Sequence, residues 1–379
     1  MSPADRAPHR VLLVRTSAMG DVVHCLPVAT ALRRHWPEVR IGWVVEQPYA
    51  PLVAGLSAVD EVLPVRLRAW RRLPLTTAHH EVRAFRAALE DFRADVALDL
   101  MGNHKGGLLA FLSGAPRRLG LARGLRREPS SAAWINRPVT PPGLEATRHH
   151  AGGPPLHAVD RALALLPALG LPAGEPADFA PQEIFSPDRF PAAAPPADAA
   201  ERPYAALHPG AGWANKVYPP AAWATVARRL AAAAGLETRV AVGPGEEALA
   251  EAVVEAAGGA ARPVPAAGLP ALAGLFRGAR LVLGGDTGPL HLAHALGAPV
   301  LAVLGPTDPH RHGPYAAPER AVWRTLPCSF CYKRLKEIKA CLSTLPAEQV
   351  SRRALALLAD GPEGEADILE RRNRPVLET

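Results

Sequence analysis

The stretch GDTGPLHLAHALG at residues 285–297 decides the fold. It follows an apolar run, RLVLG, that is typical of a buried strand, and it opens into a segment with the pattern of a helix. Thr287, Gly288 and Pro289 then stand at the helix start, where a proline is tolerated because its missing N–H would be unpaired anyway. Free amides and the helix dipole favour an anion there. The spacing fits a phosphate or nucleotide site, and it also fits a capped helix in which His291 only covers a turn.

Strand and helix patterns alternate along the rest of the chain, which favours parallel, doubly wound α/β sheets. A proline-rich segment at residues 186–203 interrupts the alternation and is interpreted as an interdomain linker. We therefore expect two Rossmann-like domains at 1–185 and 204–360, with the last helix packing back on the first domain, and a tail at 361–379. The expected strands are 11–14, 41–45, 96–100, 204–208, 239–242, 281–284 and 299–304, and the expected helices are 22–35, 221–234 and 246–257.

Composition narrows the class of protein. The chain has 379 residues, of which 48% are hydrophobic, so it can bury sizeable cores and is not of the disordered type. Its net charge of +7 favours acidic partners, such as nucleic acid, an anionic membrane surface or a phosphorylated substrate, without choosing among them. Neither a signal peptide nor an apolar run of membrane-spanning length is visible, and four cysteines make no disulfide scaffold. We expect a cytoplasmic protein that touches the inner face of a membrane.

The segment RTSAMGD at residues 15–21 follows the first expected strand. Its single glycine lacks the spacing of a dinucleotide fingerprint, and no Walker-type motif is present. The loop nevertheless lies at the carboxyl edge of a strand, where open α/β sheets bind ligands. Asp21 therefore stands either as a helix cap or as a functional carboxylate.

Two further loops follow strands in the second half. In HPGAGWANKVYP, residues 208–219, a glycine-rich backbone precedes Lys216, which suits a phosphate and equally fits a flexible loop with a solvated lysine. In GPGEE, residues 243–247, a glutamate at a helix start either complements the helix dipole or binds a ligand.

Basic residues gather in the first half of the chain. Such residues are typical of a solvated face, and as a set in one domain they also fit a clamp for several carboxylates and phosphates. They are Arg66, Arg68, Arg71, Arg72, Lys105, Arg126, Arg127, His157 and Arg161.

The cysteines carry a weaker signal. Cys328, Cys331 and Cys341 have the spacing of three zinc ligands, but a fourth ligand is not obvious, so inert thiols or a stapled loop are the alternative. Cys25 lies on an apolar helix face and is expected in the core.

The chain resembles glycosyltransferase family 9, the ADP-heptose:lipopolysaccharide heptosyltransferases, from about residue 11 to about residue 350. The resemblance rests on RTSAMGD, on Lys216 in its loop, and on DTGPLH. It implies a GT-B architecture, two Rossmann-like domains facing across a cleft, whose closure brings Asp21 to the donor. It further implies inverting transfer of L-glycero-D-manno-heptose from ADP-heptose with neither cofactor nor metal, and no Asp-x-Asp pair is present to suggest one.

Roles for individual residues follow from the same resemblance. Asp21 is the implied catalytic base, with His24 as the alternative. Lys216 and the amides of Thr287 and Gly288 are implied to stabilise the diphosphate leaving group. The remaining implied donor contacts are Glu246 to the ribose, with Glu247 as the alternative, and Asp286 and His291 to the sugar or a phosphate.

The implied acceptor is Kdo-lipid A at the inner face of the inner membrane, which the type I members of the family bind. Neither nucleic acid nor a stable protein partner is expected for this chain. The implied acceptor-binding residues are Thr16, Ser17, Arg68, Arg71, Arg72, Lys105, Arg127, His157 and Arg161. The chain departs from the family in having Met101 where a glutamine is common, and Val217 and Tyr218 after Lys216. A family member acting on a later core sugar, a nucleotide-sugar epimerase and a non-catalytic nucleotide-binding module remain as alternatives.

Overall fold

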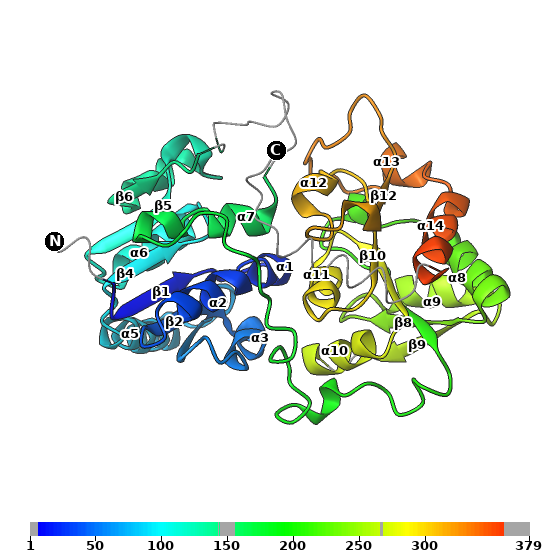
Figure 1. Cartoon of the computed structure of the whole chain (residues 1–379), viewed down its shortest axis with the longest axis horizontal. Helices are drawn as coiled ribbons and strands as arrows, with labels where there is room; N and C mark the ends of the chain where they lie inside the picture. The colour runs from blue at the N-terminus through cyan, green and yellow to red at the C-terminus, as the bar shows by residue number, and fades with distance from the viewer. Residues whose placement is uncertain (1–6, 143, 145–155, 266–267, 360–379) are drawn as a thin grey trace. The chain divides into compact units, whose positions relative to one another are not determined.

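A computed structural model of the chain describes residues 7–142, 144, 156–265 and 268–359. They form two compact units, residues 7–184 and 185–359, each built around one parallel sheet of six strands with helices packed against it (Figure 1). The strand orders are β3-β2-β1-β4-β5-β6 and β12-β11-β10-β7-β8-β9. In each sheet the first strand of the unit is central, the next two strands are added on one side of it and the last three on the other. This arrangement confirms the predicted doubly wound α/β fold.

The first unit begins with its central strand. Its strands are β1 (Arg10–Val14), β2 (Arg40–Glu46), β3 (Glu61–Val65), β4 (Val96–Asp99), β5 (Arg117–Leu121) and β6 (Arg137–Val139). Its α-helices are α1 (Met19–Val23), α2 (Leu26–His35), α3 (Ala50–Ala54), α4 (Leu67–Trp70), α5 (Leu75–Asp91), α6 (His104–Leu112) and α7 (Ala158–Leu163). Short 3-10 helices include η3 (Arg123–Leu125) and η4 (Pro129–Trp134).

The second unit repeats this plan. Its strands are β7 (Tyr204–His208), β8 (Glu237–Val242), β9 (Ala261–Pro265), β10 (Leu281–Gly285), β11 (Val300–Leu304) and β12 (Ala321–Trp323). Its α-helices are α8 (Pro220–Ala234), α9 (Glu247–Ala257), α10 (Leu269–Arg277), α11 (Gly288–Ala295), α12 (Pro309–His312), α13 (Ala340–Ser343) and α14 (Ala347–Ala359). The 3-10 helices η6 (Pro191–Ala193) and η7 (Ala214–Lys216) flank β7.

The central strands are apolar throughout because helices cover both faces of a parallel sheet. Residues 11–14 of β1 are fully buried, and all five residues of β11 are buried as well. The covering helices present one apolar stripe, as in α8, where Trp223, Val226 and Leu230 pack into the core of the second unit. Gly235 ends α8 in the left-handed conformation, φ +63°, that a residue with a side chain rarely adopts.

The helix predicted at 22–35 was wrong in extent. The structure breaks it into α1 and α2, with a turn at His24 and Cys25 between them. Pro27, in the first turn of α2, cannot donate to the preceding turn, and its ring would collide with the carbonyl of Val23 in a continuous helix. Cys25 is buried, as predicted, but in this turn rather than on a helix face, and burial raises the pKa of its thiol to about 12.

The proline-rich segment at 186–203 packs on the second unit. Ala193 in η6 is fully buried, and Arg277 donates hydrogen bonds to the carbonyls of Phe185 and Ala193, at 3.1 and 3.2 Å. A side chain on Gly274 would collide with the carbonyl of Ala194, since its Cβ would lie 2.4 Å away. These contacts seat residues 185–194 against α10.

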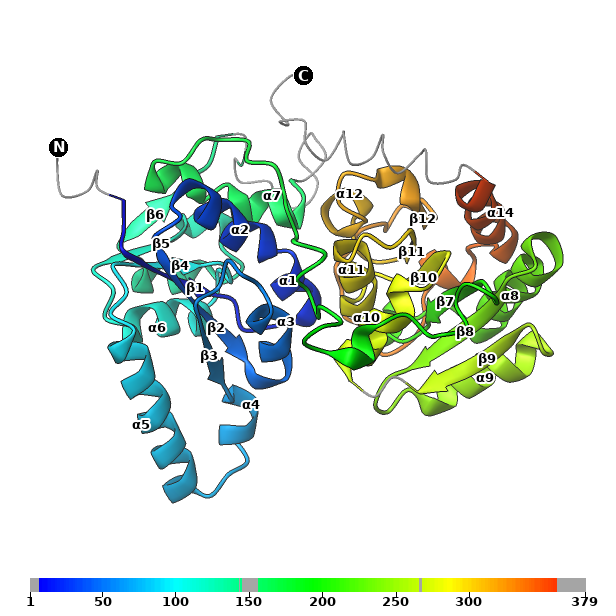
Figure 2. The same ribbon diagram turned by 60° about the horizontal axis from the view of Figure 1, so that its bottom comes forward.

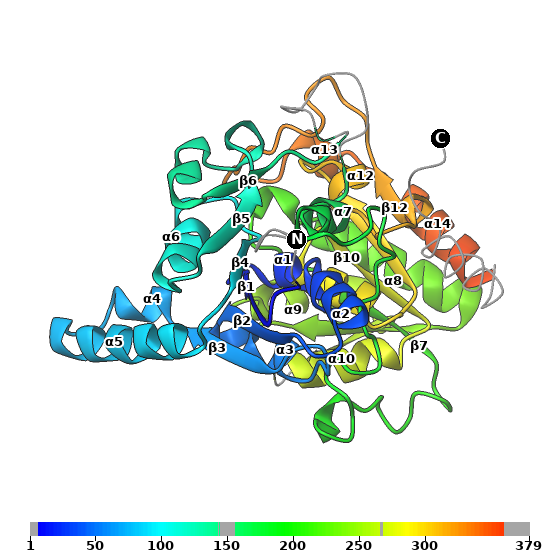
Figure 3. The same ribbon diagram turned by 60° about the vertical axis from the view of Figure 1, so that its left-hand side comes forward.

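Helices α4 and α5 project from the first unit beyond the edge of its sheet, joined by a short turn at their outer end (Figures 2 and 3). No helix was predicted from the sequence in this segment. In the described part of the chain, no helix is both long enough and apolar enough to span a bilayer.

Candidate functional site

The loops singled out in the sequence lie at the carboxyl edges of the two sheets. In the first unit, residues 15–21 follow β1 and Lys105 lies after β4, and in the second unit the three loops follow β7, β8 and β10. The winding reverses between β1 and β4 in one sheet and between β7 and β10 in the other. Open α/β sheets bind ligands at such reversal points, because the loops there diverge and leave room.

Asp21 lies in α1, directly after β1, and its side chain is 39% exposed. Its Oδ1 atom is 2.6 Å from Nη2 of Arg15, and its Oδ2 atom accepts a hydrogen bond of 3.2 Å from the N–H of Ala18. Burial would lower the pKa of Arg15, but Asp21, Cys25 and Asp99 together outweigh this effect and raise it. Arg15 also donates to the carbonyl of Leu100, so the Asp21 carboxylate is held in place while one side faces solvent.

Glu46, which the sequence analysis did not single out, ends β2 beside this site. It is 8% exposed, and its N–H donates to the carbonyl of Thr16 at 3.0 Å. Burial raises the pKa of the Glu46 carboxyl, while Arg68 and Lys105 act in the opposite direction. Two of the predicted acceptor residues, from α4 and α6, therefore lie near one carboxylate at the sheet edge.

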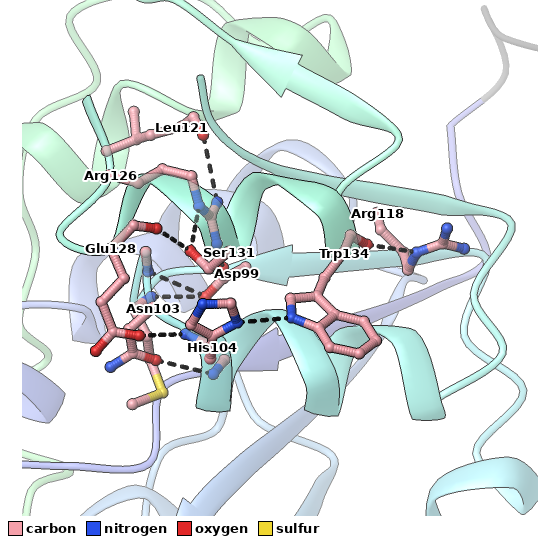
Figure 4. A network of polar contacts seen from close by, with 12 residues as sticks. Asp99, Asn103, His104, Arg118, Leu121, Arg126, Glu128, Ser131 and Trp134 are labelled. Carbon is pink, nitrogen blue, oxygen red and sulfur yellow. Dashed lines mark hydrogen bonds and ion pairs between the residues drawn. The ribbon is translucent and has the colours of Figure 1, made fainter. Parts of the chain in front are cut away.

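A buried ion pair organises the loops that carry Lys105 and Arg127 (Figure 4). Arg126 donates to Asp99 Oδ2, to Ser131 Oγ at 2.8 Å and to the carbonyl of Leu121 at 3.3 Å. Both charged side chains of the pair are fully buried. The pair therefore ties the end of β4 to the 123–131 segment.

The other oxygen of Asp99 holds the start of α6. It accepts hydrogen bonds from the N–H groups of Met101 and Gly102, at 3.0 and 3.2 Å. Gly106 leaves room for it, since a Cβ there would lie 2.2 Å from Asp99 Oδ1. His104 completes the network by binding Ser130 at 2.8 Å and accepting a hydrogen bond of 3.1 Å from the indole of Trp134.

The predicted acceptor residues divide into two groups. The exposed group has side chains at the surface of the first unit: Arg68, Arg71, Arg72, Lys105 and Arg127, with Ser17 half-buried. In the second group the side chains are engaged within the unit. Thr16 is buried and donates to Met101 Sδ at 3.4 Å, His157 accepts from the N–H of Val159 at 3.1 Å, and Arg161 donates to the carbonyl of Leu125.

In the second unit, Lys216 is held between a carboxylate and an aromatic ring. Its Nζ atom lies 2.6 Å from Asp286 Oδ2 and 4.5 Å from the ring centroid of Trp213. Asp286 also receives Thr307 Oγ1 at 2.7 Å and lies 3.0 Å from His291 Nε2. The Asp286 side chain is only 6% exposed, so the structure places it as the group that orients Lys216 and His291.

These partners determine the protonation state of Asp286. Burial alone would raise the pKa of its carboxyl, but the Lys216 ammonium and the hydrogen bond from His291 hold that pKa well below its usual range. Asp286 is therefore ionised at neutral pH, and its carboxylate holds the Lys216 side chain at the carboxyl edge of β7 and β10.

Glu246 lies at the residue before α9, beyond the carboxyl end of β8, the strand that neighbours β7. Its Oε2 atom lies 3.2 Å from His208 Nε2, and this neighbouring imidazole lowers the pKa of the Glu246 carboxyl although burial opposes this. Gly210 and Gly243 leave room for this carboxylate. A Cβ on Gly210 would lie 2.0 Å from one Glu246 oxygen, and a Cβ on Gly243 would lie 2.7 Å from the other. Glu247, the alternative, is exposed, and its carboxylate accepts from the N–H of Gly245.

Helix α11 begins as predicted, with Thr287 before its first residue, Gly288, and Pro289 in its first turn. The Thr287 side chain makes no capping hydrogen bond to this helix start. Amides in the first turn of a helix lack partners within the helix, so the start of α11 can bind an anion.

The three cysteines of the second half are free thiols, exposed at Cys328, half-buried at Cys331 and buried at Cys341. Burial, and then the two other thiols, raise the pKa of Cys341, so the three lie near one another. Within the part of the chain that the structure describes, no three His, Cys, Asp or Glu side chains are placed to hold a metal ion together.

Comparison with known proteins identifies the family. The family model of glycosyltransferase family 9 (heptosyltransferase) matches residues 82–341. The chain is 33% identical to lipopolysaccharide heptosyltransferase 1 of Pseudomonas aeruginosa over 330 residues, which cover 86% of each protein. The chain belongs to glycosyltransferase family 9.

Solved structures of family 9 agree with this assignment. The Escherichia coli heptosyltransferase WaaC with ADP superimposes with a TM-score of 0.73 at 29% identity, covering 92% of this chain and 99% of WaaC. WaaC with ADP-2-deoxy-2-fluoro heptose gives a TM-score of 0.71 at 28% identity over the same shares of the two chains. These matches confirm the predicted GT-B fold class and show that this family 9 member is a glycosyltransferase of the heptosyltransferase type, in lipopolysaccharide synthesis.

Three residues of the candidate site, Glu46, His208 and Thr307, were given no role from the sequence, and Arg126 was named only as a member of the basic set. Each lies at or just after the carboxyl end of a strand, or in the next turn of the chain. A polar residue ending an apolar strand is the signal that could have found Glu46 and His208. Arg126 and Thr307 show no such signal, because their partners are distant in sequence.

Proposed function

We propose that the chain transfers L-glycero-D-manno-heptose from ADP-heptose to a Kdo residue of Kdo-lipid A, inverting the anomeric centre and using no metal ion. The donor is supported by WaaC, which was solved with ADP and with ADP-2-deoxy-2-fluoro heptose. The type of acceptor is supported by the relatives, which are named lipopolysaccharide heptosyltransferase 1. The observation that carries the proposal is the Asp286–Lys216 pair beside the uncapped start of α11.

In the proposed mechanism the second unit holds the donor. The diphosphate lies against Lys216 and the amides at Thr287 and Gly288, which stabilise the charge that develops on the leaving group. Asp286 holds the Lys216 ammonium in position, 2.6 Å from its Oδ2 atom. Cationic and amide groups would supply the stabilisation that a divalent ion gives in other transferases.

Glu246 is proposed to bind the ribose hydroxyls of the donor. Its Oε2 atom is buried and, among the described residues, makes no hydrogen bond of good geometry, although His208 lies 3.2 Å away. A buried carboxylate oxygen of this kind is stabilised by a hydroxyl donor. Gly210 and Gly243 keep the space around the carboxylate open.

Asp21 is proposed as the general base in the first unit. It would take the proton of the acceptor hydroxyl as that oxygen attacks the anomeric carbon, and the diphosphate would leave as ADP. Arg15 and the N–H of Ala18 hold the two carboxylate oxygens, and the 39% exposure of the side chain leaves it open to an acceptor. Arg68, Arg71, Arg72, Lys105 and Arg127 would bind the carboxylates and phosphates of Kdo-lipid A.

The test is a transfer assay in the presence of EDTA. Purified protein is incubated with ADP-heptose and either Kdo2-lipid A or the same lipid already carrying one heptose, and ADP release and acceptor mass are measured. The proposal predicts a gain of one heptose on Kdo2-lipid A alone, with EDTA having no effect. Product only with the heptosylated lipid would move the assignment to a later core sugar, and loss of product in EDTA would overturn the metal-free mechanism.

A further inference from the structure

Helix α5 contains a long segment that no part of the described chain covers. It has 17 residues, of which only Leu89, near its C-terminal end, is buried. Leu89 packs into the core of the first unit together with Phe92, and Phe85 lies partly buried against it. The preceding residues extend beyond the sheet edge alongside α4 (Figures 2 and 3).

The apolar stripe of α5 continues along this projecting part. Leu75, Ala78, His79 and Val82 follow the spacing i, i+3, i+4 and i+7, so they share one face of the helix. Together with Leu67, Trp70, Arg71 and Thr76 they line an open hollow of about 740 Å³ between α4 and α5. The Leu75 side chain is 88% exposed, and Val82 is 41% exposed.

The hairpin keeps its shape without covering this stripe. The indole of Trp70 donates to Glu81 at 2.8 Å, Arg66 forms an ion pair with the same carboxylate at 2.8 Å, and Trp70 packs on Phe85 at 5.7 Å between ring centroids. Four of the five exposed large apolar side chains of the described residues lie on α5 and α6, two helices in contact. They are Leu75, Val82, Leu108 and Phe111.

Positive charge surrounds the stripe. From Arg66 to Phe85 the chain has five arginines and one glutamate, a net charge of +4 with histidine neutral. Arg68, Arg71, Arg72 and Arg83 are all exposed. Apolar side chains within a basic rim are complementary to an anionic lipid surface, which offers hydrocarbon below a layer of negative headgroups.

We propose that the α4–α5 hairpin, residues 66–85, docks the enzyme on an anionic bilayer, with Leu75 and Val82 entering the headgroup region and the arginines binding lipid phosphates. The inference rests on the proposed function, because an acceptor carried by a lipid has to be met at a membrane surface. It adds a second role for this part of the molecule, since neither Leu75 nor Val82 belongs to the proposed acceptor set.

The test uses the full-length protein and vesicles that contain no lipopolysaccharide. Co-sedimentation is measured with vesicles of phosphatidylcholine and with vesicles in which about a third of the lipid is phosphatidylglycerol. We expect binding to the anionic vesicles only, weakening as salt is raised. The double variant Leu75→Asp with Val82→Asp is expected to bind at least about tenfold more weakly, and Arg83→Glu about fivefold or more.

Ile338→Asp is the matched control, since Ile338 is an exposed apolar residue of the second unit, at 36% exposure, and should leave vesicle binding unchanged. Hydrogen exchange of the wild-type protein provides a readout without substitution, with amides of residues 67–82 expected to become protected by anionic vesicles. Absence of binding, or equal loss in Ile338→Asp and in the double variant, would overturn the proposal. Loss of self-association in the double variant with vesicle binding intact would identify a second copy as the occupant instead.

Transfer to a deacylated, water-soluble Kdo acceptor separates this proposal from the proposed function. The double variant should transfer heptose to it at the wild-type rate, because the soluble acceptor needs no membrane. If the wild-type protein binds anionic vesicles through the hairpin but transfers to neither acceptor, the proposed function fails and the docking surface stands. If transfer occurs but vesicles lacking the acceptor are not bound, the docking surface fails and the function stands.

Discussion

At the scale of single residues, two glycines determine where the Glu246 carboxylate can lie. Gly210 is the tighter of the two, because a Cβ there would lie 2.0 Å from one carboxylate oxygen. The Glu246 side chain would have to leave its position, and with it the proposed contact to the donor ribose.

Gly210→Ala is therefore expected to weaken ADP binding about tenfold, in keeping with an overpacking cost of about 1–3 kcal/mol. Gly212→Ala is the control in the same loop, since no heavy atom lies within 4 Å of a Cβ at that position. Isothermal titration with ADP measures both variants. Equal affinities in the two would show that Glu246 makes no contact with the nucleotide.

The second residue-scale prediction concerns Asp286 and pH. Because its pKa in the folded protein lies well below the ordinary value of 3.8, ionised Asp286 adds stability above pH 3.8 that is lost as pH falls through the folded pKa. Asp286→Asn leaves the Lys216 ammonium unpaired, and at pH 7 we expect it to lower the free energy of unfolding by about 3–5 kcal/mol. Urea unfolding followed by tryptophan fluorescence measures this difference.

The difference between the wild-type protein and Asp286→Asn should shrink as pH is lowered from 4 toward the folded pKa of Asp286. Asn215, the buried residue before Lys216 in η7, is not ionisable, so its replacement should give a difference that does not change with pH in this range. A pH-independent difference for Asp286→Asn would contradict the ion pair with Lys216.

At the scale of elements, the Asp99–Arg126 pair joins β4, the start of α6 and the 123–131 segment. Removing only the guanidinium leaves a fully buried carboxylate without its charged partner, so Arg126→Met is expected to cost about 3–5 kcal/mol of unfolding free energy. The double variant Arg126→Met with Asp99→Leu removes both charges and should recover part of that loss. Denaturant unfolding of the wild-type protein, Arg126→Met, Asp99→Leu and the double variant forms the cycle, and a double variant as unstable as the sum of both singles would exclude the coupling.

The sequence predicted structure that neighbouring residues determine, and it did not predict contacts between residues that are far apart in the chain. The start of α11 was predicted because Thr287, Gly288 and Pro289 are neighbours and set the local backbone themselves. The break between α1 and α2 was missed although Pro27 signals it, because the apolar pattern runs through the turn. The Lys216–Asp286 pair joins residues 70 positions apart, and Arg126 meets Asp99 across 27 positions, so the order of the strands determines these contacts.

At the scale of the whole molecule, the same strand order occurs twice, and the proposed roles divide between the two units. The second unit holds the groups assigned to the donor, around Lys216 and Glu246. The first unit holds Asp21 and the exposed basic residues assigned to the acceptor. Donor binding and proton removal should therefore be separable by substitution.

The most direct test of the account is the single-turnover rate of heptose transfer in Asp21→Asn, measured beside the affinity for ADP-2-deoxy-2-fluoro heptose. The account predicts a rate about 10²–10⁴-fold below the wild-type rate, because the base is lost, with donor affinity within about twofold of wild type. A transfer rate close to wild type, or a loss of rate explained by weaker donor binding, would contradict the assignment of Asp21 as the catalytic base.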